Sequence, residues 1–117
     1  MPRFHHVNLG VPPEAVDAEA DFLTSVLGYR RLQSPPDLQQ YNPKWFEADD
    51  GTQVHLSVDP EHRPAARAHT AIELAGQSAE VERRLGEAGI DVQVRGDGDG
   101  RTLFCADPAG NLWELRA

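Results

Sequence analysis

Four residues of types that commonly bind metal ions occur at matching positions in two halves of the sequence. They are His6, His55, His69 and Glu114. His55 and Glu114 each follow a glycine by four residues, come directly after an apolar residue and directly before a leucine, and they are 59 residues apart in a chain of 117. His6 and His69 form the second pair of corresponding positions. The spacing predicts an internal duplication, with one candidate ligand at each end of each half.

Three imidazoles and a carboxylate suit a divalent transition ion, whether zinc, nickel, cobalt, iron or manganese. Two histidines and one carboxylate alone would already form a facial triad that leaves coordination positions open. A lone histidine on a strand is usually a surface residue or a satisfied core residue. Four at repeat-related positions favour a metal site. His5 is interpreted as structural, and His62, between Glu61 and Arg63, as solvated.

The elements that must position these residues follow from hydrophobic periodicity. Residues 4–11 alternate between apolar and polar side chains, which predicts a strand with one core-facing side. Residues 14–27 have helical spacing and end at Gly28. Further strands are expected at 29–33, 45–48 and 53–58. The second half repeats this order, with a strand at 69–74, a helix capped by Ser78, and strands at 90–94, 103–106 and 111–115. Each half therefore reads β-α-β-β-β, with the four candidate ligands on the faces opposite the core.

Composition restricts the possible partners. The formal net charge is −8, so nucleic acid or an anionic membrane surface would be repelled. Cys105 is the only cysteine, which excludes an internal disulfide. No apolar run is long enough to span a bilayer and no signal peptide is evident, so the sequence predicts a cytoplasmic protein without nucleic-acid or membrane partners.

The sequence resembles the vicinal oxygen chelate superfamily, which includes glyoxalase I, fosfomycin resistance proteins, extradiol dioxygenases and bleomycin resistance proteins. The resemblance covers nearly the whole chain. Its most specific motif is Asp107-Pro108-x-Gly110-Asn111-x-x-Glu114-Leu115, and weaker support comes from His6-Val7-x-Leu9-x-Val11, Phe22 with Leu27-Gly28, segment 51–56 and His69. It implies an α+β fold in which two tandem βαβββ modules form an open, cupped mixed sheet. Residues 1–117 would be one domain, with module one at 1–60, a linker at 61–67 and module two at 68–117. It also implies a homodimer.

The resemblance assigns the metal ligands to His6, His55, His69 and Glu114, and makes Glu114 the catalytic residue that carries a proton. Glyoxalase I usually has a glutamate where His55 stands, so a strict glyoxalase I assignment is disfavoured. The chain ends three residues after Glu114, which argues against a fosfomycin thiol transferase with a C-terminal anion-binding extension.

The predicted function is that of a divalent-metal-dependent enzyme acting on a small oxygen-chelating substrate. Isomerase or lyase chemistry through an enediolate-type anion is expected, and the net positive site would favour anionic substrates. One alternative is an Fe(II) extradiol-type dioxygenase using His6, His69 and Glu114. Another is a drug-binding dimer of the bleomycin resistance type. Its stacking surfaces would be Tyr41, Trp45, Phe46 and Trp113, although core or dimer contacts are the favoured interpretation of these aromatics. Arg63, Arg67 and Lys44 are possible anion contacts, although solvated charges are the favoured interpretation.

Overall fold

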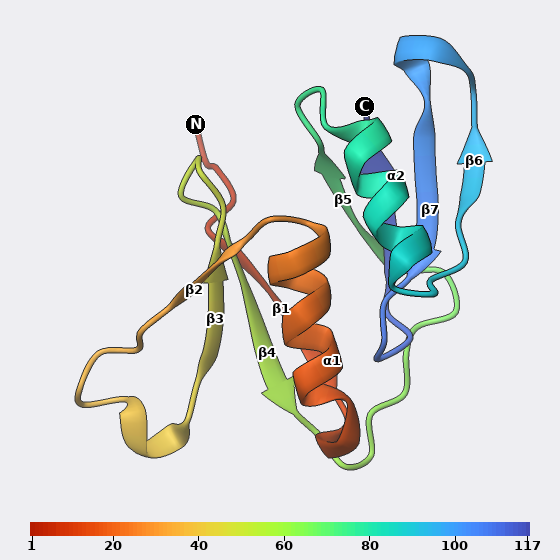
Figure 1. Ribbon diagram of the computed structural model, residues 1–117. Helices are drawn as coiled ribbons and strands as arrows, with labels where there is room; N and C mark the ends of the chain where they lie inside the picture. The colour runs from red at the N-terminus through yellow and green to blue at the C-terminus, as the bar shows by residue number, and fades with distance from the viewer. The chain divides into compact units, whose positions relative to one another are not determined.

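A computed structural model describes residues 1–117, except for the side chains of Tyr41 and Asp99. The chain divides into two compact units, residues 1–63 and residues 64–117. Each unit contains its own four-stranded mixed sheet. The order β-α-β-β-β occurs in both units, which confirms the α+β fold of two βαβββ modules (Figure 1).

The sheet of the first unit has the strand order β1-β4-β3-β2. The first and last strands of the unit, β1 (His6–Val11) and β4 (Gln53–Val58), are parallel neighbours. The other two, β3 (Lys44–Glu47) and β2 (Arg30–Leu32), continue the sheet in antiparallel fashion. Between β1 and β2 runs a helical segment made of a 3-10 turn (Pro13–Ala15), α1 (Val16–Asp21) and a π turn (Phe22–Val26). A further 3-10 turn, Gln39–Tyr41, precedes β3.

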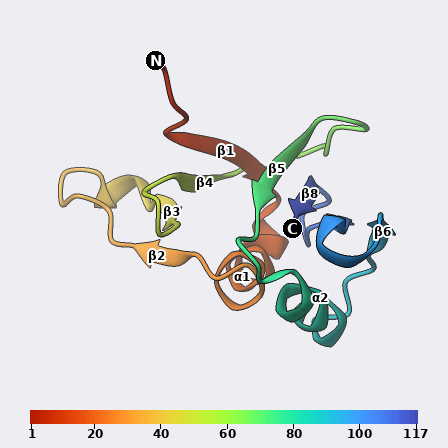
Figure 2. The same ribbon diagram turned by 90° about the horizontal axis from the view of Figure 1, so that it is seen from above.

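The core of the first unit explains which way its strands face. Val54 and Leu56 are buried on β4, as is Phe46 on β3, while His55 between the two buried positions of β4 faces the opposite side. The helical segment, which buries Phe22 and Leu23, lies along one side of the sheet (Figure 2). Strand alternation therefore leaves the opposite face of the sheet to polar side chains.

The second unit repeats this arrangement with the strand order β5-β8-β7-β6. Its first and last strands, β5 (His69–Glu73) and β8 (Leu112–Arg116), are parallel, and β7 (Thr102–Ala106) and β6 (Gln93–Arg95) follow in antiparallel pairing. A 3-10 turn, Gly98–Gly100, lies between β6 and β7. The strand predicted at 90–94 begins later than expected, because the Ile90 N–H donates to the Leu85 carbonyl and so still belongs to the end of the helix.

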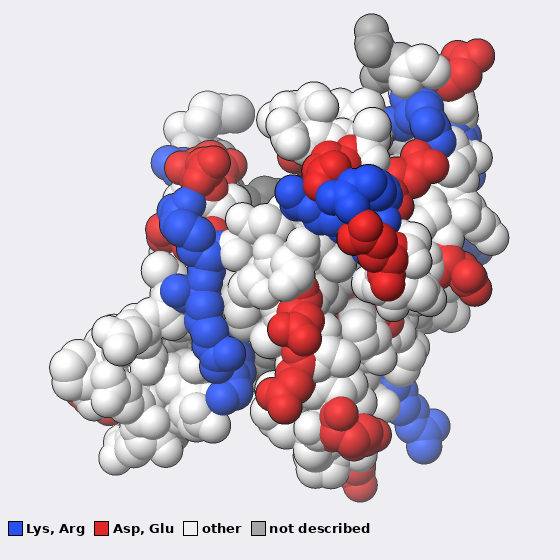
Figure 3. Space-filling view, in the orientation of Figure 1, with Lys and Arg blue, Asp and Glu red and all other residues white. Residues whose placement is uncertain are grey.

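The helix of the second unit, α2 (Ser78–Glu87), is amphipathic. Val81 and Leu85 are buried, whereas Glu80, Arg83, Arg84 and Glu87 form ion pairs on the exposed side (Figure 3). The hydrogen bond from Arg83 lowers the pKa of Glu80 to about 2. None of the described helices is long and apolar enough to cross a bilayer.

The predicted cap at Ser78 is wrong. The N-cap position is Gln77, and the Ser78 hydroxyl caps nothing; its Oγ is buried with no hydrogen-bond partner among the described residues. A buried hydroxyl without a partner costs free energy, because it loses its hydrogen bonds to water.

The turn between β7 and β8 is organised by a buried carboxylate. Asp107 Oδ1 accepts the backbone N–H groups of Ala109 (3.0 Å) and Asn111 (2.9 Å), and its Oδ2 accepts the indole N–H of Trp113 (2.9 Å). Gly110 has a φ of +87°, and a Cβ there would lie 2.9 Å from Pro64 Cγ. The Asp-Pro-x-Gly-Asn motif is therefore a structural turn that leads the chain into β8, the strand that carries Glu114.

We expect Asp107→Ala to lower the free energy of unfolding by about 3 kcal/mol, because three hydrogen bonds to a buried carboxylate are lost together. Urea denaturation followed by circular dichroism measures this change. Asp91→Ala, which removes an exposed carboxylate from the same unit, serves as the control and should stay within about 0.5 kcal/mol of the wild type. Equal stability of the two variants would contradict the role given to Asp107.

Ser78→Ala should stabilise the protein by about 1 kcal/mol, since it removes a buried hydroxyl without a partner and introduces a better helix former. Thermal unfolding measures the effect. Ser57→Ala is the matched control, because the Ser57 Oγ donates to Asn8 Oδ1 at 2.8 Å and its removal should not stabilise. A loss of stability in Ser78→Ala would show that the hydroxyl does find a partner.

Candidate functional site

The structure brings two of the predicted ligands together in the first unit. The imidazoles of His6 and His55 stack, with ring centroids 3.9 Å apart and an interplanar angle of 13°. The parallel pairing of β1 with β4 produces this contact, since His6 lies opposite Gln53 and Asn8 opposite His55. On the neighbouring strand Trp45 also stacks on His55, at 4.7 Å and 16°. His55 therefore lies between two nearly parallel rings.

A short hydrogen-bond chain fixes the protonation of the His55 ring. Gln53 Nε2 donates to Glu47 Oε2 at 3.3 Å, which orients the amide so that Gln53 Oε1 lies 2.8 Å from His55 Nε2. An amide oxygen only accepts, so His55 Nε2 carries the proton and Nδ1 presents a lone pair. Partners of this kind orient metal-binding histidines in proteins.

The other two histidines of the first unit depart from the sequence-based interpretation. His5 lies beside the site, with its Nδ1 2.9 Å from His6 Nδ1, so one ring donates to the other. His62 is half-buried, its Nε2 is buried without a partner among the described residues, and a Cβ at Gly10 would lie 2.6 Å from its Nδ1. The interpretation of His62 as solvated is therefore wrong.

The second unit brings the other two predicted ligands together. His69 Nε2 lies 3.4 Å from Glu114 Oε1, and His69 Nδ1 lies 3.1 Å from the backbone carbonyl oxygen of Arg67. Because a carbonyl oxygen only accepts, Nδ1 of the neutral ring carries the proton and Nε2 presents its lone pair to the carboxylate. Two acceptors that face each other attract a cation or a proton between them. Arg116 Nη1 donates to the other carboxylate oxygen, Oε2, at 2.7 Å and orients Glu114.

Both pairs thus have the donor chemistry of a metal site, with a ring nitrogen free on His55 and on His69 and a carboxylate oriented by an arginine. Each pair lies within one unit. Among the described side chains, no three His, Cys, Asp or Glu gather into one group that could hold a metal.

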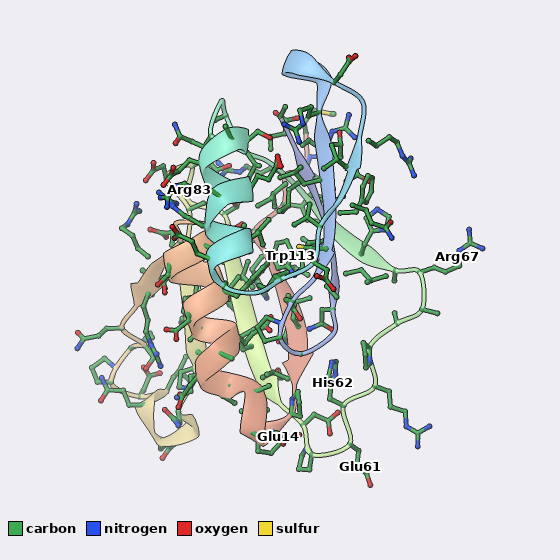
Figure 4. All side chains as sticks on the ribbon, turned by 45° about the vertical axis from the view of Figure 1, so that its right-hand side comes forward. Glu14, Glu61, His62, Arg67, Arg83 and Trp113 are labelled. Carbon is green, nitrogen blue, oxygen red and sulfur yellow. The ribbon has the colours of Figure 1, made fainter. Side chains whose placement is uncertain are left out.

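An open hollow of about 640 Å³ lies in the second unit and includes His69 in its lining. Apolar side chains form much of its wall, among them Ile90, Phe104 and Leu112. The guanidinium carbon of Arg95 lies 4.8 Å from the centroid of the Phe104 ring. Arg67 lines the edge, and its side chain extends away from the protein (Figure 4).

The aromatic residues considered as stacking surfaces for a drug are mostly core residues. Phe46 is 0% and Trp113 is 1% exposed. Trp45 is half-buried and stacks on His55 rather than standing free. Tyr41 lies outside the side chains that the structure describes. These positions weaken the drug-binding alternative.

Sequence reasoning missed Gln53, the partner of His55, and Arg95, the cation of the hollow. Gln53 had a usable signal, because it precedes His55 by two residues and therefore shares its strand face. Glu47, which accepts the hydrogen bond from Gln53, also lies beside Arg30, whose Nη2 is 3.4 Å from Glu47 Oε1.

Comparisons with known proteins agree with the fold. The sequence model of the glyoxalase-like domain family matches residues 9–116. A glyoxalase family protein of Bacillus anthracis has 24% identity and a TM-score of 0.81 over 98% of this chain and 93% of its own. A glyoxalase/dioxygenase of Nostoc punctiforme has 25% identity and a TM-score of 0.80 over 97% and 89%.

The fosfomycin resistance protein FosX of Listeria monocytogenes has the same fold. Its E126Q mutant, complexed with Mn(II) and 1S,2S-dihydroxypropylphosphonic acid, has 19% identity and a TM-score of 0.75, over 100% of this chain and 90% of its own. No curated protein sequence matches.

The structure predicts an acidic shift for one histidine. Burial, followed by the nearby positive charges of His6 and His5, lowers the pKa of His55 from about 6.5 to about 4 in the metal-free protein. The unfolded chain binds this proton as the pH falls below about 6.5, whereas the folded chain does not until about pH 4. The contribution of His55 to stability is therefore lost progressively between pH 6.5 and 4. NMR titration of the imidazole carbon signals, after a chelator has removed any bound metal, measures this pKa.

Trp45→Ala should raise the pKa of His55 toward 6.5, because the substitution removes the ring that shields one face of the imidazole from water. A His55 that titrates near 6.5 in the metal-free wild type would contradict the buried stack.

Proposed function

Since the chain belongs to the glyoxalase-like domain family, we propose that it is a divalent-metal-dependent enzyme acting on a small oxygen-chelating substrate. The chemistry is of the isomerase or lyase type. The observation that carries this proposal is the placement of His69 Nε2 against Glu114 Oε1, with Nδ1 bonded to a carbonyl oxygen. A ring nitrogen and a carboxylate oxygen that face each other as acceptors offer two ligand atoms to a metal ion.

We propose that the metal ligands are His6, His55, His69 and Glu114. Support comes from the matching register of the two units, where β1 pairs with β4 and β5 with β8 in parallel, so that each unit presents its pair from its first and last strands. The Mn(II) complex of FosX, a protein of the same fold, supports a divalent ion. Three neutral imidazoles and one carboxylate would leave a divalent site with a net charge of +1.

The bound ion would act as a Lewis acid that stabilises negative charge on a substrate oxygen. Glu114 would hold and move a proton. In support of this role, its Oε1 lies 3.4 Å from His69 Nε2, and Arg116 donates to its Oε2. Glu47 is not a second base in this scheme, since Gln53 and Arg30 occupy its oxygens. Its part is to hold Gln53, which in turn orients His55.

We further propose that the protein is a homodimer. Each four-stranded sheet is open and ends in two edge strands, β1 and β2 in the first unit and β5 and β6 in the second. Uncovered edges present backbone hydrogen-bonding groups, which proteins commonly protect by association.

The metal proposal is tested by elemental analysis of natively purified protein and by calorimetric titration of stripped protein with Mn²⁺ and Zn²⁺. We expect one ion per chain, and at least a tenfold loss of affinity in His69→Ala and in Glu114→Gln. Glu73→Gln is the matched control, because Glu73 is an exposed carboxylate on β5, two positions beyond Ala71, the register partner of Glu114. It should bind metal like the wild type.

The proposed ligand set can be tested separately in the first unit. His6→Ala should weaken metal binding by a similar factor, although His6 lies in the other unit. Wild-type affinity in His6→Ala, combined with a loss in His69→Ala, would remove His6 from the proposed ligand set. Wild-type affinity in both variants would rule out the metal site altogether.

A further inference from the structure

We propose that the hollow of the second unit binds a small carboxylate with a flat apolar body, and that Arg95 pairs with the carboxylate. This names the substrate class of the proposed enzyme and rests on the proposed function only insofar as His69 lines the same hollow. Arg95 is not one of the proposed metal ligands, so the carboxylate site and the metal site can be tested separately.

The first observation concerns the arginines of the second unit, which number six in residues 64–117. Four of them form ion pairs with glutamates: Arg83, Arg84, Arg101 and Arg116. The other two, Arg67 and Arg95, form no ion pair with a described carboxylate, and both line the hollow. The chain has a net charge of −8, yet neither of these two arginines has an acidic partner among the described side chains. An anionic ligand in the hollow would supply the missing negative charge.

The Arg95 side chain is restrained by an aromatic ring. Arg95 lies on β6 opposite Thr102, and its guanidinium carbon is 4.8 Å from the centroid of the Phe104 ring on the adjacent strand. Contact with the ring face restrains the guanidinium while its N–H donors, which lie in the guanidinium plane, stay available. A planar carboxylate matches these donors in pairs.

The third observation concerns the rest of the wall. Phe104, Leu112 and Ile90 are half-buried apolar side chains that line the hollow. A volume of about 640 Å³ is in the range of small-molecule sites. Among the acidic lining residues, Asp107 is already bonded to Ala109, Asn111 and Trp113, and Asp91 is exposed. The wall therefore offers an apolar surface beside one restrained cation.

Arg67 has a different part. Its side chain extends outward from the edge of the unit (Figure 4), so it adds positive potential at the hollow rather than a defined contact. Its carbonyl oxygen bonds to His69 Nδ1, which ties the hollow to the proposed metal ligand. A ligand held by Arg95 has its carboxylate in the same hollow that His69 lines.

The test is an NMR titration of the isotope-labelled full chain, as purified, with benzoate and with its neutral analogue benzamide. We expect benzoate to shift the amide signals of Phe104 and Leu112 and the indole signal of Trp113, with a dissociation constant at least tenfold below that of benzamide. Arg95→Gln should abolish this preference and leave the metal content unchanged. Arg101→Gln, which removes an arginine paired with Glu82 outside the hollow, should retain the preference.

Three results would overturn the proposal. These are equal binding of the two probes, no shift with either probe, and a benzoate preference that survives Arg95→Gln. Glu114→Gln separates the two ideas, because a preference that is lost in this variant but kept in Arg95→Gln would place benzoate at the metal. That outcome would refute the carboxylate site at Arg95 but would not contradict the proposed metal-dependent function.

Discussion

The contact of His69 with Glu114 is the interaction on which the proposed metal site rests. The parallel pairing of β5 with β8 sets Ala71 opposite Glu114 and places His69 two residues earlier on the same strand face. The Arg67 carbonyl then fixes the proton on Nδ1, and Arg116 fixes the carboxylate. As a result, a lone pair on Nε2 and an oxygen of Glu114 face each other 3.4 Å apart. This arrangement is stable with a cation or a proton between the two atoms, and it gives the site its chemistry.

The same construction explains the first unit and the differences between the two. There β1 and β4 are parallel as well, but the two candidate ligands are both imidazoles, so their rings stack, whereas His69 faces a carboxylate. Trp45 orients the His55 ring, and Gln53 fixes the position of its proton. In the second unit the Arg67 carbonyl fixes the proton of His69, and Arg116 orients Glu114. One duplicated topology therefore supports two chemically distinct pairs.

Much of the fold could be predicted from alternation and helical spacing, because apolar residues at those spacings, such as Val54, Leu56, Val81 and Leu85, are the buried ones. The candidate ligands followed from the same alternation. The partners of these ligands did not, since the hydrogen bonds from Gln53 to Glu47 and from His69 to the Arg67 carbonyl depend on strand register and loop geometry. Arg95 could not be selected from the sequence either. It is distinguished from the paired arginines by having no carboxylate partner among the described side chains, and only the structure reveals these pairings.

X-ray absorption at the metal edge, on the full chain reconstituted with Zn²⁺, tests whether the proposed residues bind the ion. We expect a first shell of nitrogen and oxygen only, with the outer-shell scattering of three imidazoles, falling to two in His69→Ala. A shell without imidazole scattering, or one that His69→Ala leaves unchanged, would rule out this ligand set.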